Sequence, residues 1–298
     1  MYAEPEDLDR AEVARVLADH WGIAAPLRYL PVGFGTHHYR AGEHWFVNVD
    51  EPGTQPDLER ALATAGALRD SGLEFVHAPR PRATGGFVAV LPSGYAVSVY
   101  GFLDGTAHPF GAFPTEAERR TVLAALARLH AARPAVLPHR DDLAITARSD
   151  YAALDLSTPW SGGPFAGPAR ELVGRRRAVV DEAFAAYDAL VPAVRATADG
   201  WVVTHGEPHA GNVLWLTGGG FRLIDWDTVA LGPPERDLWM FAHDSAVAEL
   251  YRLRWWLEEV CLYVTELHGA HVDDANTRAS WRELRRCLAQ QPISRAAR

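Results

Sequence analysis

Residues 204–212 read THGEPHAGN, and residues 221–228 read FRLIDWDT. Histidine, carboxylate and asparagine side chains are concentrated in this short region, among glycines. Between the two polar clusters, the apolar runs VLWL and FRLI flank the Gly-rich sequence TGGG, a pattern typical of a β-hairpin. The region therefore predicts two antiparallel strands with polar side chains collected at one end.

The pairing of these strands determines which polar side chains meet. If Leu216 pairs with Phe221, Asn212 lies directly opposite Asp225, with Cβ atoms about 4.5–5.5 Å apart. An amide oxygen and a carboxylate at that spacing can share one magnesium ion with water or phosphate oxygens. Glu207, in the loop before the first strand, can then act as a base beside a metal-bound phosphate, as in phosphoryl transfer. The alternative is that Asn212 and Asp225 only cap the ends of the hairpin.

A second alternative concerns the two histidines of the first cluster. His205 and His209 are four residues apart with Glu207 between them, a spacing that would suit a zinc hydrolase if the segment were helical. Gly206 and Pro208 oppose that helix, because glycine is flexible and proline cannot donate a backbone hydrogen bond. The phosphoryl-transfer interpretation is therefore preferred.

The composition is that of a folded, acidic protein. The chain has 298 residues, of which 48% are hydrophobic and 22% charged. An acidic N-terminal sequence and the lack of an apolar run of about 18 residues predict a soluble, cytoplasmic protein without a membrane partner. Cys261 and Cys287 lack metal-type spacing and are expected to be buried free thiols. The net charge of −9 argues against a nucleic-acid partner and is compatible with a cationic ligand.

Two kinds of sequence pattern divide the chain. After a helical pattern at residues 7–21, strand-like runs follow with one helical segment, residues 56–70, between the second and third; the runs are LRYLPVG, HWFVNVD, FVHAP, FVAVL and YAVSVYGFL. Beyond residue 105 helical patterns dominate, at 115–132, 167–197, 249–268 and 273–291. Thr115 and Glu118 predict a capping box for the first of these helices. The change near residues 99–105 predicts a domain boundary.

The motifs resemble those of a known family. HGEPHAGN at 205–212 followed by LIDWD at 223–227, with ARLH upstream and RDLW downstream, is similar to the aminoglycoside phosphotransferase family. The kinase-like fold of that family also serves choline, fructosamine and related small-molecule kinases. The YRLRWWLEE run at Tyr251 is most similar to the spectinomycin phosphotransferase branch. The resemblance covers nearly the whole chain and implies an α+β, bilobal kinase-like fold: a nucleotide-binding lobe with a small antiparallel sheet at 1–99, a hinge at 100–105 and a larger helical lobe at 106–298.

The resemblance also implies roles for individual residues. His205 would shape the catalytic loop, Asp237 would support it, and Glu207 stands where the family has its catalytic aspartate. Asp227 would assist a second metal ion or the substrate, and the magnesium ligands would be Asn212 and Asp225.

Nucleotide binding is expected in the first lobe and the hinge. Backbone groups around Gly101 and Leu103 would contact adenine, with Tyr100 at the back of the pocket. The phosphates of ATP or GTP would lie under the GFGTH loop at residues 33–37, which contains Gly33 and Gly35.

Two residues depart from the family pattern. Asn48 stands where the family has a lysine that contacts the α- and β-phosphates, so its expected ion-pair partner, placed at Glu59, has no cation. Because all 29 Lys and Arg positions of this chain are arginine, no lysine elsewhere can substitute. Glu207 carries one methylene more than the family's aspartate, which moves its carboxylate by about 1 Å. The nearest substitute cations in the sequence are Arg40, His37 and His38.

These observations predict an ATP- or GTP-dependent, magnesium-requiring phosphotransferase that acts on a hydroxyl group of a small polar molecule. An aminoglycoside or aminocyclitol acceptor, and hence antibiotic resistance, is the first hypothesis. A metabolic kinase for a sugar, amino sugar or amino alcohol is the second. A nucleotide-binding protein that has lost catalysis is the third, and it is supported by Asn48 and Glu207.

Overall fold

The computed structural model describes residues 1–33, 35–111 and 113–290, which form two compact units. The first unit contains residues 1–141 and 201–241, and the second contains residues 142–200 and the chain from 242 onward. The first unit therefore holds the predicted nucleotide lobe, the predicted hinge and the whole hairpin region. The division at residues 99 and 106 stays a prediction about function, because the compact units follow different boundaries.

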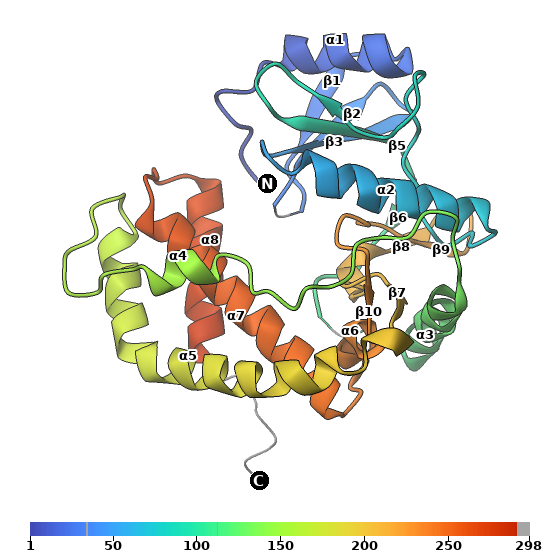
Figure 1. The fold of residues 1–298 in the computed structure, drawn as a ribbon. Helices are drawn as coiled ribbons and strands as arrows, with labels where there is room; N and C mark the ends of the chain where they lie inside the picture. The colour runs from blue at the N-terminus through green and yellow to red at the C-terminus, as the bar shows by residue number, and fades with distance from the viewer. Residues whose placement is uncertain (34, 112, 291–298) are drawn as a thin grey trace. The chain divides into compact units, whose positions relative to one another are not determined.

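A five-stranded antiparallel sheet dominates the first part of this unit (Figure 1). Its order is β1-β2-β3-β5-β4, with bounds β1 Leu27–Leu30, β2 His37–Ala41, β3 Trp45–Asp50, β4 Ala89–Val90 and β5 Ala96–Gly101. The sheet confirms the predicted small antiparallel sheet. Strand β2 was not predicted, because its sequence HHYRA hides the apolar alternation behind histidine and arginine side chains. The FVHAP run was wrongly predicted as a strand of this sheet: Val76 makes only a parallel bridge to Leu223.

Helix α1 (Arg10–Trp21) covers one face of the five-stranded sheet. Because side chains alternate along a strand, every second residue points to this face. Tyr39 of β2 and Val47 of β3 are fully buried there in a cluster with Val13 and Leu17 of α1.

Helix α2 (Gln55–Asp70) covers the opposite face (Figure 1). Phe46 of β3 and Tyr100 of β5 pack there with Leu58 and Leu62 of the helix. We call this the α2 face of the sheet. Asn48 has the same strand parity as Phe46 and therefore belongs to the α2 face.

The remaining strands of the first unit build the hairpin and its surroundings. A three-stranded sheet has the order β6-β8-β9, and β7 pairs with β10. Their bounds are β6 Gly105–Thr106, β7 Val202–Thr204, β8 Val213–Leu216, β9 Phe221–Leu223 and β10 Ala230–Gly232. Helices α3 (Glu116–Ala131) and α6 (Glu235–Leu238) and the 3-10 turns η2 (Ala210–Asn212) and η3 (Trp239–Phe241) belong to the same unit.

The hairpin forms as predicted, but its register differs by one residue. Trp215 pairs with Phe221, so Asn212 lies opposite Ile224 instead of Asp225, and the Ile224 N–H donates to the Asn212 carbonyl at 3.0 Å. The turn closes with a hydrogen bond from Leu216 N–H to the carbonyl of Gly220, at 3.0 Å. Two consecutive glycines at this turn, 219 and 220, have positive φ angles, which lets the chain reverse over residues 217–219, one residue fewer than the predicted pairing assumed.

A core cluster lies between α2 and the hairpin region of the first unit. It combines Leu68 of α2, Leu126 of α3 and Leu223 of β9 with Phe75 and the fully buried Trp226. The α2 helix therefore packs against the five-stranded sheet on one side and against the hairpin region on the other.

The second unit is helical. It contains α4 (Arg148–Ala152), α5 (Ala166–Arg195), α7 (Ala246–His268), α8 (Ala275–Ala289) and the 3-10 turn η1 (Ala198–Gly200). Helix α7 packs against both α5 and α8. Cys261 and Cys287 are buried and free, as predicted. In the part of the chain that the structure describes, no helix is long and apolar enough to cross a membrane.

The capping box of α3 gives a first prediction. The Thr115 hydroxyl accepts from the Glu118 N–H at 3.2 Å, and the Glu118 carboxylate accepts from the Thr115 N–H at 3.2 Å. Replacement of Thr115 by alanine leaves the first turn without this acceptor, so urea unfolding should show a loss of about 1 kcal/mol. Thr121→Ala, at an exposed position of the same helix, is the matched control and should cost less. Equal losses in the two variants would contradict the capping role.

Candidate active site

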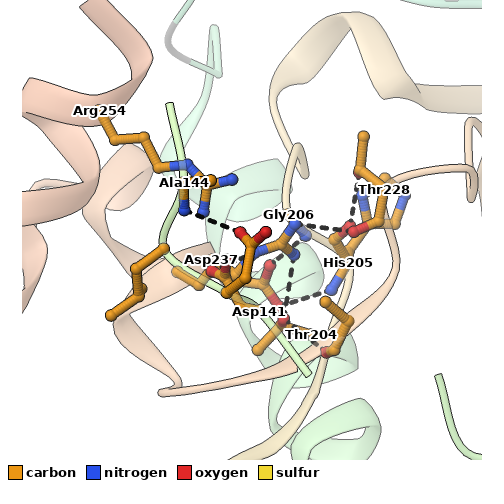
Figure 2. A network of polar contacts seen from close by, with 12 residues as sticks. Asp141, Ala144, Thr204, His205, Gly206, Thr228, Asp237 and Arg254 are labelled. Atoms are coloured by element: carbon orange, nitrogen blue, oxygen red, sulfur yellow. Dashed lines mark hydrogen bonds and ion pairs between the residues drawn. The ribbon is translucent and has the colours of Figure 1, made fainter. Parts of the chain in front are cut away.

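The loop around Gly206 is held by one buried carboxylate. Asp237 of α6 has an exposed fraction of 0% and accepts hydrogen bonds from the His205 N–H at 3.1 Å and the Gly206 N–H at 2.7 Å. Nε2 of His130, on α3, lies 2.8 Å from the same carboxylate, which Figure 2 shows together with His205 and Gly206. These contacts give Asp237 the supporting position that the sequence predicted.

The hydrogen bonds keep Asp237 ionised. Burial alone would raise the pKa of this carboxyl group, but the hydrogen bonds from His130 and from the Gly206 N–H outweigh burial and hold the pKa below its usual value. A buried carboxylate with several donors is a rigid anchor, because losing any one partner leaves a buried polar group unpaired.

Arg236 fixes the same loop from the adjacent position. Its guanidinium donates to the Thr204 hydroxyl at 3.1 Å and the Thr228 carbonyl at 2.7 Å, and it pairs with Asp141 at 3.2 Å. Gly206 has a φ of 101°, and a Cβ at this position would lie 2.7 Å from Nη2 of Arg236. Glycine is therefore required here by both the backbone angle and the close approach of the arginine.

His205 is a structural part of the loop. Its Nε2 lies 2.9 Å from the Ile224 carbonyl, and its Nδ1 accepts from the Glu207 N–H at 3.2 Å, so the proton is on Nε2. Burial lowers the pKa of His205, which keeps the ring neutral. Both ring nitrogens are used, so His205 does not present a free nitrogen to a metal ion. This geometry disfavours the zinc-hydrolase alternative, and no group of three His, Cys, Asp or Glu side chains in the described ranges is arranged to hold a metal.

Glu207 and Asn212 are joined through the loop backbone. The Asn212 side-chain amide donates to the Glu207 carbonyl at 3.0 Å, which turns its NH2 group toward the loop. Glu207 is half-buried, and its charge contributes to raising the pKa of Asp225. The negative charge of Glu207 therefore acts on Asp225, although the backbone pairing of Asn212 with Asp225 was wrongly predicted.

Asp225 has an unusual backbone and an unusual electrostatic environment. Its φ of 68° lies in the left-handed region, which few residues other than glycine, asparagine and aspartate adopt. Solvent reaches the side chain of Asp225. Its pKa is nevertheless raised well above the usual range. The largest cause is the negative charge of Asp227, followed by desolvation and by the negative charge of Glu207. Strained backbone next to crowded carboxylates is characteristic of functional sites.

The donor set fits a magnesium ion. Magnesium prefers oxygen ligands and is usually held by one or two carboxylates together with phosphate oxygens and water. Asp225 supplies a carboxylate whose charge is unfavourable in the absence of a cation, and Asn212 supplies a side-chain oxygen because its NH2 group faces Glu207. Asp227 lies beside Asp225 and shares a side-chain hydrogen bond with it.

The structure adds Asp50, which the sequence analysis missed. It is the last residue of β3, on the α2 face two positions after Asn48, and it accepts from the Thr36 hydroxyl at 2.7 Å. Burial, together with the charge of Asp227, raises the pKa of Asp50 to about 7 despite the Thr36 hydrogen bond. Its strand parity with Asn48 was the available signal in the sequence.

The position expected for lysine is occupied by a neutral pair. Oδ1 of Asn48 lies 3.0 Å from Nδ1 of His38, the residue directly opposite on β2. Glu59 of α2 needs no cation, because its carboxylate accepts from the Phe87 N–H at 2.9 Å and the Val88 N–H at 2.8 Å. The missing lysine therefore leaves no unpaired carboxylate at Glu59.

The predicted nucleotide-binding residues lie in the five-stranded sheet, in the connection between β1 and β2, and in the segment after β5. Gly33 and Gly35 both have positive φ angles, 72° and 89°, and Phe34 between them lies outside the described residues. Tyr100 is buried against α2, and Gly101 ends β5 opposite Trp45.

The predicted hinge, residues 100–105, includes the end of β5 and the start of β6. Strand β5 ends at Gly101 and β6 begins at Gly105, so only residues 102–104 connect the two sheets. Within the described ranges the N–H of Leu103 has no backbone partner, which leaves it available to a ligand.

The chain is similar in sequence to known proteins. Residues 27–257 match the family described as the phosphotransferase enzyme family, APH. The chain is 29% identical to protein StrN of Streptomyces griseus over 97% of each sequence.

Solved structures share the fold. Spectinomycin phosphotransferase APH(9)-Ia, in complex with ADP and spectinomycin, is similar with a TM-score of 0.76 and 16% identity, over 97% of this chain and 99% of that chain. The microcompartment-associated aminopropanol kinase is similar with a TM-score of 0.58 and 16% identity, over 97% of this chain and 98% of that chain. The predicted α+β kinase-like fold and the predicted similarity to the spectinomycin phosphotransferase branch are confirmed.

The Asp237 network gives a second prediction. In Asp237→Asn, the side-chain NH2 group must face at least one of the present donors, so a buried donor loses its acceptor. The free energy of unfolding in urea should fall by about 1–3 kcal/mol. Asp70→Asn, at the exposed end of α2, is the control and should change stability by less than about 0.5 kcal/mol. An Asp237 variant as stable as the wild type would show that this carboxylate does not hold the loop.

Proposed function

The chain belongs to the phosphotransferase enzyme family APH and is a small-molecule kinase; from this premise we propose that it transfers the γ-phosphate of ATP or GTP to a hydroxyl group of a small polar molecule. One observation carries the proposal. The negative charges of Glu207 and Asp227 both act on Asp225, next to a loop that Asp237 holds rigidly, all within one compact unit. Such an arrangement positions a base and a metal site close together, which phosphoryl transfer requires.

Each residue has a proposed role. Glu207 accepts the proton of the attacking hydroxyl group, and Asn212 and Asp225 hold magnesium with support from Asp227. A bound magnesium ion would neutralise the phosphate oxygens during transfer. His205 positions Glu207 by accepting from its N–H group.

The nucleotide is proposed to contact residues of the five-stranded sheet and the hinge. Tyr100, Gly101 and Leu103 would surround adenine, and the phosphates would lie beside Asn48 and the loop that contains Gly33 and Gly35. The free N–H of Leu103 and the positive φ angles of both glycines support this assignment.

We propose an aminocyclitol or aminoglycoside as the acceptor, with antibiotic resistance as the consequence. The similar structure of spectinomycin phosphotransferase binds ADP and spectinomycin, and the net charge of −9 favours a cationic acceptor. ATP and GTP are cytoplasmic substrates, so the reaction is assigned to the cytoplasm.

Two other functions have specific support. The similarity to an aminopropanol kinase supports a metabolic kinase for an amino alcohol or sugar. Asn48 and Glu207 support a nucleotide-binding protein without catalysis.

An acceptor panel separates these functions. Phosphate transfer from ATP and GTP, with magnesium, should be measured to spectinomycin, an aminopropanol and neutral sugars. Transfer to spectinomycin would support the first function, and transfer to the amino alcohol or a sugar would support the second. Nucleotide binding without transfer to any acceptor would support the third.

The proposed base gives a third prediction. Glu207→Gln keeps the size of the side chain but cannot accept a proton, so kcat should fall by about 10²–10⁴-fold. Steady-state kinetics with the acceptor identified in the panel would measure the change. Glu43→Gln, at an exposed turn, is the control and should retain wild-type kcat. A Glu207→Gln variant with near-normal kcat would overturn the assignment of the base.

The Glu207→Asp variant tests whether the glutamate is fitted to its loop. If the loop is set back to accommodate the longer side chain, the aspartate variant should be slower than the wild type. A faster variant would show that the loop geometry still favours aspartate.

The proposed metal ligand gives a fourth prediction. Asp225→Asn removes one charge, and asparagine tolerates the positive φ of this position. The magnesium concentration that gives half-maximal turnover should rise by at least about 100-fold. This loss is larger than the loss caused by replacing a residue that only hydrogen-bonds to a metal ligand. Because Asp227 and Glu207 disfavour the charge of Asp225, stability at pH 7 should be equal or higher in the variant. Unchanged magnesium activation would remove Asp225 from the metal site.

A further inference from the structure

The position of the absent lysine faces a histidine. The chain contains no lysine, and Asn48 of β3 pairs directly with His38 of β2 on the α2 face of the sheet. We propose that His38 is the phosphate-binding cation of this protein, and that it takes up one proton when a nucleoside triphosphate binds. This inference rests on the proposed nucleotide-binding function and adds a specific residue to it.

The hydrogen bond to Asn48 orients the imidazole ring. Because a carbonyl oxygen only accepts, the contact between Oδ1 of Asn48 and Nδ1 of His38 places a proton on Nδ1. Nε2 is then the unprotonated nitrogen of the neutral ring. It points toward the glycine loop, since a Cβ on Gly33 would lie 2.9 Å from Nε2 of His38. Gly33 therefore leaves the space that lets Nε2 reach the loop.

The other two candidate cations are directed elsewhere. His37 has the opposite strand parity to His38, is nearly fully buried and pairs with Glu51 at 3.5 Å. Arg40 shares the α2 face, but its guanidinium lies 4.0 Å above the ring of Phe102 and donates to the Glu43 carbonyl. Of these three residues, only His38 contacts Asn48.

His38 is neutral before a nucleotide binds. Burial, followed by the positive charge of the Met1 amino group, lowers the pKa of His38 to about 4. The Met1 amino group donates to the Gly33 carbonyl at 3.2 Å, and His37 adds a smaller contribution of the same sign. On the α2 face, Arg40 lies along β2 and Asp50, with a pKa of about 7, lies along β3. An imidazole in these surroundings binds phosphate as a cation only after it takes a proton.

The proposed step is the addition of one proton to the His38 ring. A solvent proton bonds to Nε2, the ring becomes an imidazolium, and the new N–H group donates to a phosphate oxygen. The phosphate charge raises the pKa of His38 in the complex, so the extra stabilisation is present below that pKa and is lost as the pH rises through it. Between pH 5 and the pKa in the complex, nucleotide affinity should fall by up to about tenfold per pH unit, the limit for one proton.

Calorimetry tests the proposal. ATP binding, with magnesium, should be measured from pH 5 to 8 in buffers of different ionisation enthalpy, which gives the number of protons taken up. The wild type should take up more protons than His38→Gln, by close to one proton at pH 6. Protons taken up by ATP itself are common to both proteins and cancel in this difference. His44→Gln, at an exposed turn, is the matched control and should behave as the wild type.

A second variant distinguishes the loss of a cation from a folding defect in His38→Gln. Adding Asn48→Lys to that variant supplies a permanent cation, so the affinity for ATP should recover without the extra proton uptake. Equal proton uptake by the wild type and His38→Gln would overturn the role of His38 while leaving the proposed function intact. Failure of the wild type to bind any nucleotide would overturn the proposed function and this inference together.

Discussion

The buried carboxylate of Asp237 is the contact on which the site geometry depends. It accepts from two consecutive backbone N–H groups, those of His205 and Gly206, and so fixes the direction of the chain immediately before Glu207. His205 then accepts from the Glu207 N–H and reaches the Ile224 carbonyl, one residue before Asp225. The positions of the proposed base and the proposed metal ligand are thus set by one continuous hydrogen-bond network. Since the network is buried, it also resists water, which would otherwise compete for each bond.

Packing around α2 places further negative charge at this site. The helix shares one cluster with the five-stranded sheet and another with Trp226 and Leu223, which flank Asp225 along the chain. The negative charge of Asp227 consequently contributes to raising the pKa of Asp50, at the end of β3. Several carboxylates held this close repel one another, and the repulsion is relieved by a divalent cation or by protonation. This repulsion supports the proposed binding of a cation at the site.

The sequence predicted those parts of the fold and site that local patterns encode. The hairpin and the α3 capping box follow from residue type and spacing within about 25 positions of each other. The predicted register was wrong because strand pairing depends on the length of the turn, and two glycines with positive φ angles allow more than one turn length. Strand β2 was not predicted because the polar residues of HHYRA obscure the apolar alternation. The approach of Asp50 to Asp227 joins segments far apart in the sequence, and only the packing of α2 reveals it.

Asparagine in place of the expected lysine changes the charge on the α2 face of the sheet. A lysine paired with Glu59 would place a permanent cation on the α2 face, whereas here the Phe87 and Val88 N–H groups satisfy Glu59 and Asn48 forms a neutral pair with His38. Every partner of the missing ion pair is therefore already hydrogen-bonded, so the lobe loses no stability through an unpaired buried charge. What it loses is a charge of fixed sign facing the phosphates. A neutral imidazole is less costly to bury than an ammonium group, and it becomes a cation only when a neighbouring anion favours the proton. On this argument the substitution of asparagine for lysine makes positive charge at the phosphate loop conditional on the ligand that needs it.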